Sequence, residues 1–165
     1  MRYFLLILIL GVISITPSHA QWRQLLNEKT YSFAVNPKNP RTIFVGGKDG
    51  KFYRSYDAGT TWDTLKVVFQ NGNPKLTNIF IHPIDTNIII IGGIGFGSVR
   101  RSIDGGKTWS VSLERKFPMS MTSETIISDV NDPDVVYVGD FNSNLLFKSK
   151  DRGVTWDTIS KIPGE

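Results

Sequence analysis

The sequence has no cysteine and only two histidines among its 165 residues. Without cysteine no disulfide can form and no thiolate can bind a metal, so packing and hydrogen bonds must hold the fold together. One histidine, His19, lies in an N-terminal segment that we expect to be removed, which leaves His82 alone. The composition therefore argues against a His-rich metal site, and we expect no metal and no cofactor.

An excess of charge of one sign is also missing. The chain carries 19 basic and 15 acidic residues, a net charge of +4, and no basic run. Nothing in this balance predicts binding to nucleic acid or to an anionic membrane. No sustained helical period of apolar residues follows residue 20, so the sequence predicts no long amphipathic helix.

The first 20 residues have the layout of a secretory signal peptide. Arg2 precedes an apolar run over 4–15, and small residues stand at the −3 and −1 positions of a site after Ala20. A membrane anchor is the alternative, but the run is shorter than the ~20 residues that span a bilayer. We expect cleavage near Ala20, a periplasmic or extracellular protein, and no membrane span after cleavage.

The octet Ser-x-Asp-x-Gly-x-Thr-Trp occurs three times, at intervals of 47 residues. The copies read SYDAGTTW, SIDGGKTW and SKDRGVTW. Their matched residues are Ser55, Asp57, Gly59, Thr61 and Trp62; Ser102, Asp104, Gly106, Thr108 and Trp109; and Ser149, Asp151, Gly153, Thr155 and Trp156. A match at this constant spacing indicates an internal structural repeat.

Four short segments rich in β-branched and aromatic residues surround each octet, separated by Gly, Pro, Asn and Asp. Four antiparallel strands in a repeat of about 45 residues are typical of a β-propeller blade. The sequence therefore predicts an all-β protein with three four-stranded blades, over 28–67, 68–114 and 115–165. Residues 21–27 resemble the fourth strands, and we expect them to form an outer strand that closes a ring.

Closed propellers use about 4–8 blades, so three blades and one strand predict a fragment of a longer protein. The remaining blades would come from the same longer chain, or several copies of this chain would assemble into a ring.

The repeated octets resemble the Asp-box, or bacterial neuraminidase repeat. This motif occurs in sialidases, sortilin-type receptors, some xyloglucan hydrolases and a photosystem II assembly factor. The resemblance covers the whole chain after residue 20 and implies a propeller fold, but not one particular chemistry.

A hairpin between the third and fourth strands explains the octet residues. The aspartates would accept hydrogen bonds from turn amides, and the glycines would take a positive φ. The Ser and Thr hydroxyls would bind backbone groups, and the tryptophans would point back into their own blade.

The glycine-rich stretches fail as ligand loops. A phosphate-binding loop would need glycine where Arg101 stands, and the sister octets replace Lys107 with Thr60 and Val154. The stretch GGIGFG over 92–97 has serine where a dinucleotide-binding loop needs its third glycine. Calcium loops fail because no octet supplies alternating carboxylates.

Strand alternation places the octets and the Pro-containing turns at one end of the blades, and the remaining loops at the other. Binding residues tend to lie on variable loops over a rigid scaffold, which favours the end opposite the octets. The candidate binding residues there are Lys48, Asp49, Phe96, Arg115, Phe117, Asp140, Phe141 and Asn142. For Asp49 and Asp140 the alternative is a turn-forming role, and for Phe117 burial beneath neighbouring loops.

We expect an exported, non-catalytic module for recognition or scaffolding, with a protein or glycan ligand. The alternative is a glycoside hydrolase of sialidase or xyloglucanase type whose catalytic residues lie largely outside this chain. The Arg-Ile-Pro motif that the sialidase resemblance implies is absent, and no carboxylate pair is recognisable. We assign no catalytic residue.

Overall fold

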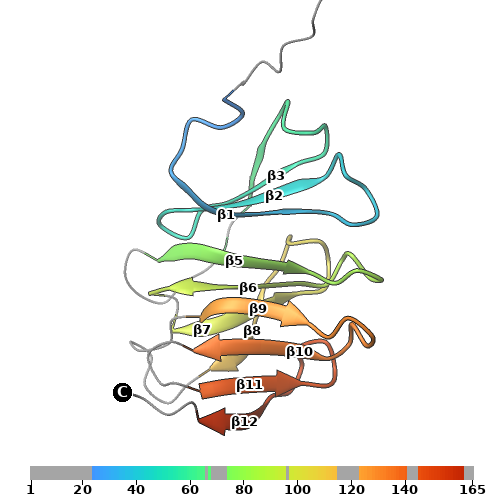
Figure 1. Ribbon diagram of the computed structural model, residues 1–165. Coiled ribbons are helices and arrows are strands. Elements are labelled where there is room, and N and C mark those ends of the chain that lie inside the picture. Colours follow the sequence, from blue (N-terminus) through green and yellow to red (C-terminus); the bar gives the residue numbers. More distant parts are fainter. Residues whose placement is uncertain are drawn as a thin grey trace, which may run out of the picture.

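The computed structural model describes residues 24–65, 67, 74–95, 97–114, 123–140 and 145–161. These residues form twelve strands and no helix (Figure 1). The first sheet contains β1 (Thr30–Val35), β2 (Ile43–Gly47), β3 (Phe52–Ser55) and β4 (Asp63–Leu65). The second contains β5 (Lys75–Ile81), β6 (Ile89–Ile94), β7 (Ser98–Ser102) and β8 (Ser110–Glu114). The third contains β9 (Ser123–Ser128), β10 (Val136–Asp140), β11 (Leu145–Ser149) and β12 (Asp157–Lys161).

Each sheet joins its four strands in sequence order, and every pair is antiparallel. The register repeats as well, because the octet serine at the end of each third strand faces an Ile or Val of the second strand. These pairs are Ser55 with Ile43, Ser102 with Ile89, and Ser149 with Val136. The three sheets are therefore three copies of one unit.

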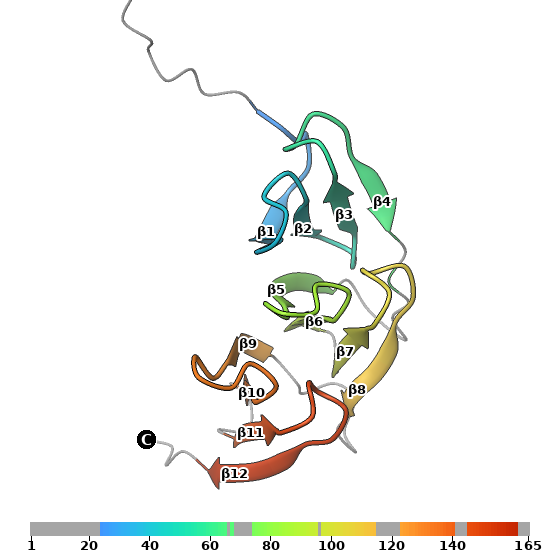
Figure 2. The ribbon, with the colours of Figure 1, turned by 90° about the vertical axis from the view of Figure 1, so that its right-hand side faces the viewer.

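The sheets stack face to face around their first strands. Strand β5 contacts β1 and β2 of the preceding sheet, and β9 contacts β5 and β6. Figure 2 shows β1, β5 and β9 on one side of the molecule, with β4, β8 and β12 on the outer side. This fan of four-stranded antiparallel sheets confirms the predicted β-propeller blades.

Two apolar layers between the sheets make the core. Phe44 and Phe52 of the first sheet meet Ile89 and Ile91 of the second, all at most 2% exposed. Ile90, between those isoleucines, points the opposite way and packs against the third sheet. Both faces of β6 are thus buried, which explains why its sequence is a continuous apolar run rather than an alternating one.

Backbone hydrogen bonds confirm the expected division of the loops between two ends. Ala58 N, in the first octet, donates to Arg41 O of the β1–β2 turn at 2.8 Å. At the opposite end, Gly50 N of the β2–β3 turn donates to Pro74 O before β5 at 2.9 Å. The described residues contain no helix long and apolar enough to cross a membrane. The expected signal peptide lies outside the described residues.

The expected outer strand at 21–27 is described only from residue 24 onward. Residues 24–26 run outside all three sheets and carry no strand assignment. This segment nevertheless contacts the first octet, as described below.

Candidate functional site

The second octet shows how the repeated residues build their turn. Ser102 Oγ donates to Asp104 Oδ1 at 2.8 Å and accepts the backbone N–H of Gly106 at 2.8 Å. Asp104 Oδ1 accepts the backbone N–H groups of Lys107 and Thr108 at 3.0 and 2.9 Å. Asp104 Oδ2 accepts the Thr108 hydroxyl at 2.6 Å. The same bonds recur in the other two octets, so each carboxylate is used within its own turn.

These hydrogen bonds lower the pKa of the octet aspartates from 3.8 to about 2. For Asp57 the largest cause of the lower pKa is the backbone N–H of Thr61. For Asp104 and Asp151, burial raises the pKa, but the hydrogen bonds from the Thr hydroxyl and the turn outweigh it. The Thr hydroxyls therefore bind the carboxylates rather than the backbone groups that we had expected. At neutral pH the octet aspartates are anions that accept hydrogen bonds.

Two consecutive residues of each octet adopt a positive φ. Gly59, Gly106 and Gly153 lie at 86°, 86° and 79°, which confirms the prediction for these glycines. The preceding positions also lie in the left-handed region, and the sequence reasoning missed them. Those residues are Ala58, Gly105 and Arg152, at 59°, 72° and 60°. The turn geometry is thus strong enough to hold even an arginine in this region.

The octets also connect neighbouring sheets. Arg54 Nη1 donates to Gly105 O of the next octet at 3.2 Å, and Arg101 Nε donates to Arg152 O at 2.8 Å. Arg54 and Arg101, the basic residues before the first two octets, thus connect their sheets to the following ones.

The tryptophans reach in the opposite direction, toward the preceding sheet. Trp156 Nε1 donates to Ser112 Oγ of β8 at 2.9 Å. The Trp109 ring packs edge-on against the Phe52 ring of β3, with the two ring centroids 5.4 Å apart. Trp109 and Trp156 also pack against the apolar clusters to which their own sheets contribute, so each points into its blade and reaches the preceding sheet as well.

A polar cluster connects the second and third sheets. His82 is fully buried, and its Nδ1 accepts the Asp85 N–H at 3.0 Å, which leaves Nε2 to donate to Asp134 Oδ1 at 3.0 Å. Arg152 Nε donates to the same Oδ1 at 2.8 Å, and this bond is the largest cause of a lowered Asp134 pKa. The cluster bridges the turns of two sheets. Sequence reasoning missed it, because its members do not recur in the repeats.

The loop end opposite the octets holds the predicted binding residues that the structure describes. Lys48 and Asp49 are exposed neighbours with Nζ and Oδ1 3.9 Å apart, and Asp49 has a turn φ of 59°. Asp140 ends β10 and is only 3% exposed, so it lies in the interior rather than on an open loop surface. The other candidates, namely Phe96, Arg115, Phe117, Phe141 and Asn142, lie outside the described residues.

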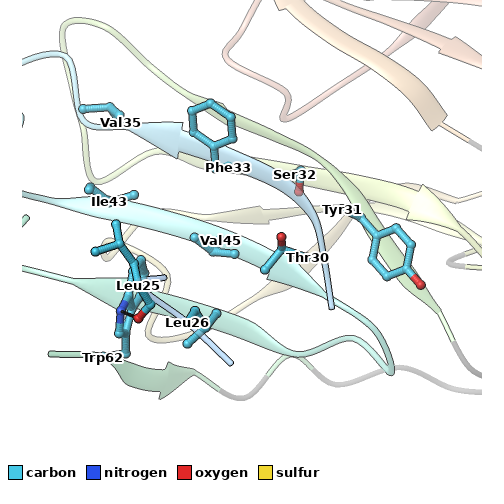
Figure 3. Close-up of a pocket in the computed structure, with 10 residues that line it drawn as sticks. All are labelled: Leu25, Leu26, Thr30, Tyr31, Ser32, Phe33, Val35, Ile43, Val45 and Trp62. Atoms are coloured by element: carbon cyan, nitrogen blue, oxygen red, sulfur yellow. Dashed lines mark hydrogen bonds between the residues drawn. The ribbon is translucent and has the colours of Figure 1, made fainter. Parts of the chain in front are cut away.

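An apolar cavity of about 630 Å³ opens on the face of β1 and β2 that points away from the second sheet. Figure 3 shows Phe33 and Val35 projecting from β1, with Leu25 beside Trp62 at the margin. Trp62 Nε1 donates to Leu25 O at 3.0 Å, which fixes the N-terminal segment there. The ten lining residues include no Asp, Glu, Lys, Arg or His. Such a surface suits apolar contact, and it offers no carboxylate for acid–base catalysis. Within the described ranges no three His, Cys, Asp or Glu side chains gather as metal ligands do.

No family model matches the sequence. A xyloglucanase of Acetivibrio thermocellus is 28% identical over 137 residues, which cover 73% of this chain and 16% of that enzyme. The crystal structure of the GH74 xyloglucanase from Xanthomonas campestris aligns with a TM-score of 0.65 at 19% identity, over 81% of this chain and 24% of that one. The structure of YCF48 bound to D1 peptide aligns with a TM-score of 0.60 at 18% identity, over 79% and 39% of the two chains. The chain thus spans about a sixth of the xyloglucanase that it matches, and its fold is that of β-propeller blades.

Proposed function

We propose that this chain is a segment of a larger, exported β-propeller of the Asp-box type. Its three blades act as a non-catalytic scaffold that presents the loop end opposite the octets to a protein or glycan. The layout of residues 1–20 supports export, and the small share of the relatives' length supports a larger protein. The identical Ser–Asp–Gly–Thr hydrogen bonds in the three turns support the Asp-box assignment.

The non-catalytic part of the proposal rests on the hydrogen bonds and ion pairs that the carboxylates already make. A glycosidase needs two carboxyl groups that face a substrate about 5–10 Å apart. Here the octet aspartates are held inside their turns, Asp134 is bound by His82 and Arg152, and Glu28 pairs with Lys51 at 2.8 Å. No acidic side chain lines the cavity on the first sheet. These carboxylates therefore stabilise turns and contacts between sheets, which supports a scaffold role.

A glycoside hydrolase segment is the second candidate. The observation in its favour is the sequence similarity to a xyloglucanase over most of this chain. In that case the catalytic carboxylates would lie mainly in the rest of a longer protein.

Xyloglucan tests whether these blades bind or cleave a glycan by themselves. We expect the full chain to release no reducing ends above the buffer rate. If the loop end binds this glycan, the chain will be retarded in a gel that contains xyloglucan. Lys48→Glu should then weaken the retardation, whereas Lys107→Glu, on the exposed octet end, should not. Release of reducing ends that is lost in Asp49→Asn would overturn the non-catalytic assignment.

A further inference from the structure

Two lysines lie opposite each other where the first and second sheets meet at the loop end. Lys48 of the β2–β3 turn and Lys75 at the start of β5 are partners in an isolated antiparallel bridge. Next to this bridge, Gly50 N donates to Pro74 O at 2.9 Å, so the backbone holds the two lysines side by side. Like charges directly opposite each other in a sheet destabilise it. This pair therefore departs from what folding alone favours, and such departures are typical of functional sites.

The contacts of the two ammonium groups leave their charge open to a ligand. Lys48 Nζ lies 3.9 Å from Asp49 Oδ1, beyond hydrogen-bond distance, and 49% of the Lys48 side chain is exposed. Lys75 Nζ lies 5.6 Å from the centre of the Tyr31 ring. An aromatic ring attracts a cation but does not neutralise its charge. Both ammonium groups therefore keep the capacity to bind an anion.

Two more lysines extend the positive charge around the same turn. A Cβ on Gly47 would lie 3.4 Å from Lys29 O, which places the Lys29 backbone beside the end of β2. Lys51 follows the turn, and its Nζ donates to Glu28 Oε1 at 2.8 Å, which raises the pKa of Lys51. We refer to these four lysines and the neighbouring tyrosine as the lysine surface, which consists of Lys29, Lys48, Lys51, Lys75 and Tyr31.

The Tyr31 ring adds an aromatic edge to the lysine surface. Tyr31 is 39% exposed, and Figure 3 shows its ring projecting from the start of β1, away from Phe33 and Val35. Aromatic rings pack well against flat apolar surfaces, and ammonium groups form strong hydrogen bonds with carboxylates. An acidic sugar offers both a C–H face for the ring and a carboxylate for a lysine.

We propose that the lysine surface binds a polyuronate, a glycan that carries carboxylate groups along its chain. This assignment rests on the proposed function, because it gives a ligand class to the same loop end. Lys48 and Lys75 donate charge-assisted hydrogen bonds to carboxylates of the glycan, and the Tyr31 ring packs against one of its sugar rings. The bound carboxylates also offset the repulsion between the two lysines, because they bring negative charge close to both.

Calorimetry with the full chain compares three polymers. Polygalacturonate is the polyuronate probe, xyloglucan is the neutral glycan, and polyglutamate is the acidic peptide. We expect polygalacturonate to bind about tenfold more tightly than either of the others, since several exposed ion pairs add to the contact with the ring. Raising the salt concentration from ~50 to ~200 mM should weaken the binding of polygalacturonate, because salt screens exposed charges.

Matched variants of the full chain locate the site. Lys48→Gln and Lys75→Gln should each weaken polygalacturonate binding by about threefold, the size of one exposed ion pair. Lys107→Gln, the same change on the exposed octet end, should leave binding unchanged, and Lys48→Arg should retain it because the charge remains. The urea midpoint of Lys48→Gln should not fall below that of Lys107→Gln, since the substitution also removes the repulsion from Lys75.

The results that overturn the proposal are distinct from those that overturn the proposed function. Equal affinities of Lys48→Gln, Lys75→Gln and Lys107→Gln for polygalacturonate, or no binding of this polymer, overturn the polyuronate assignment. Tighter binding of polyglutamate overturns it as well, because the ligand is then an acidic peptide. In each of these cases, retardation by xyloglucan that Lys48→Glu weakens would still support the loop end as a binding site.

Discussion

The two adjacent glycines of the second octet provide a sharp test of how the octet packs. Gly105 and Gly106 both have a positive φ, 72° and 86°. A Cβ on Gly106 would lie 3.1 Å from Phe52 Cε1 and 3.4 Å from Leu65 Cδ1, both in the preceding sheet. A Cβ on Gly105 would meet only Asn87 Oδ1, at 3.7 Å. The two substitutions to alanine therefore share a backbone cost and differ in the contact between sheets.

The left-handed conformation costs an L-residue ~1–2 kcal/mol. Alanine leaves the unfolded chain less conformational freedom than glycine does, which raises the free energy of unfolding by ~0.4–1 kcal/mol. Gly105→Ala should therefore lower the free energy of unfolding by about 1 kcal/mol or less. The sister octets, with Ala58 and Arg152 at this position, agree with a small cost. Gly106→Ala adds overpacking against Phe52, which costs ~1–3 kcal/mol in a packed core, for a total of about 1–4 kcal/mol.

Urea unfolding followed by tryptophan fluorescence measures the stability of both variants. An unchanged m-value will show that unfolding exposes the same amount of surface in each. We expect a clearly lower midpoint for Gly106→Ala than for Gly105→Ala. Equal midpoints, or a lower midpoint for Gly105→Ala, would refute the reasoning that the octet is packed against the preceding sheet at Gly106.

Two further predictions concern the octet charges and the ties between sheets. Because the folded pKa of the octet aspartates is about 2, below the ordinary 3.8, their stabilisation is present at neutral pH and is lost as the pH falls from about 4 toward 2. Urea midpoints over this range should show the loss, and Asp104→Asn should reduce its size; an unchanged profile would contradict the assignment. Arg101→Met removes the donor to Arg152 O and should cost ~1–3 kcal/mol in the same assay. Lys148→Met, the equivalent change in the last sheet, should lower the free energy of unfolding by less. Equal decreases for the two variants would contradict a stabilising role for the hydrogen bond between Arg101 and Arg152 O.

The parts of the fold that depend on short-range chemistry could be predicted. The octet hydrogen bonds join residues two to four positions apart, so the sequence of each octet is enough to specify its turn. Alternation of strands then placed the octets and the first turns of the sheets at one end. The loop end was predicted less well, because Asp140 proved to be buried at the end of a strand.

The contacts between sheets could not be predicted, because the repeat says nothing about which neighbour a side chain reaches. Arg54 and Arg101, the basic residues before the first two octets, bind carbonyls 51 residues away in the chain. The His82–Asp134 bond joins residues 52 positions apart in the chain.

The sequence by itself determined the repeating unit, its four strands and its turn, since these follow from local residue types at a constant spacing of 47 residues. Only the tertiary structure decided which face of each sheet is buried and which is open. Phe33 and Ile79 occupy the same position of the repeat, and both are apolar. The first is exposed and the second is packed between sheets, because burial depends on whether a neighbouring sheet is present.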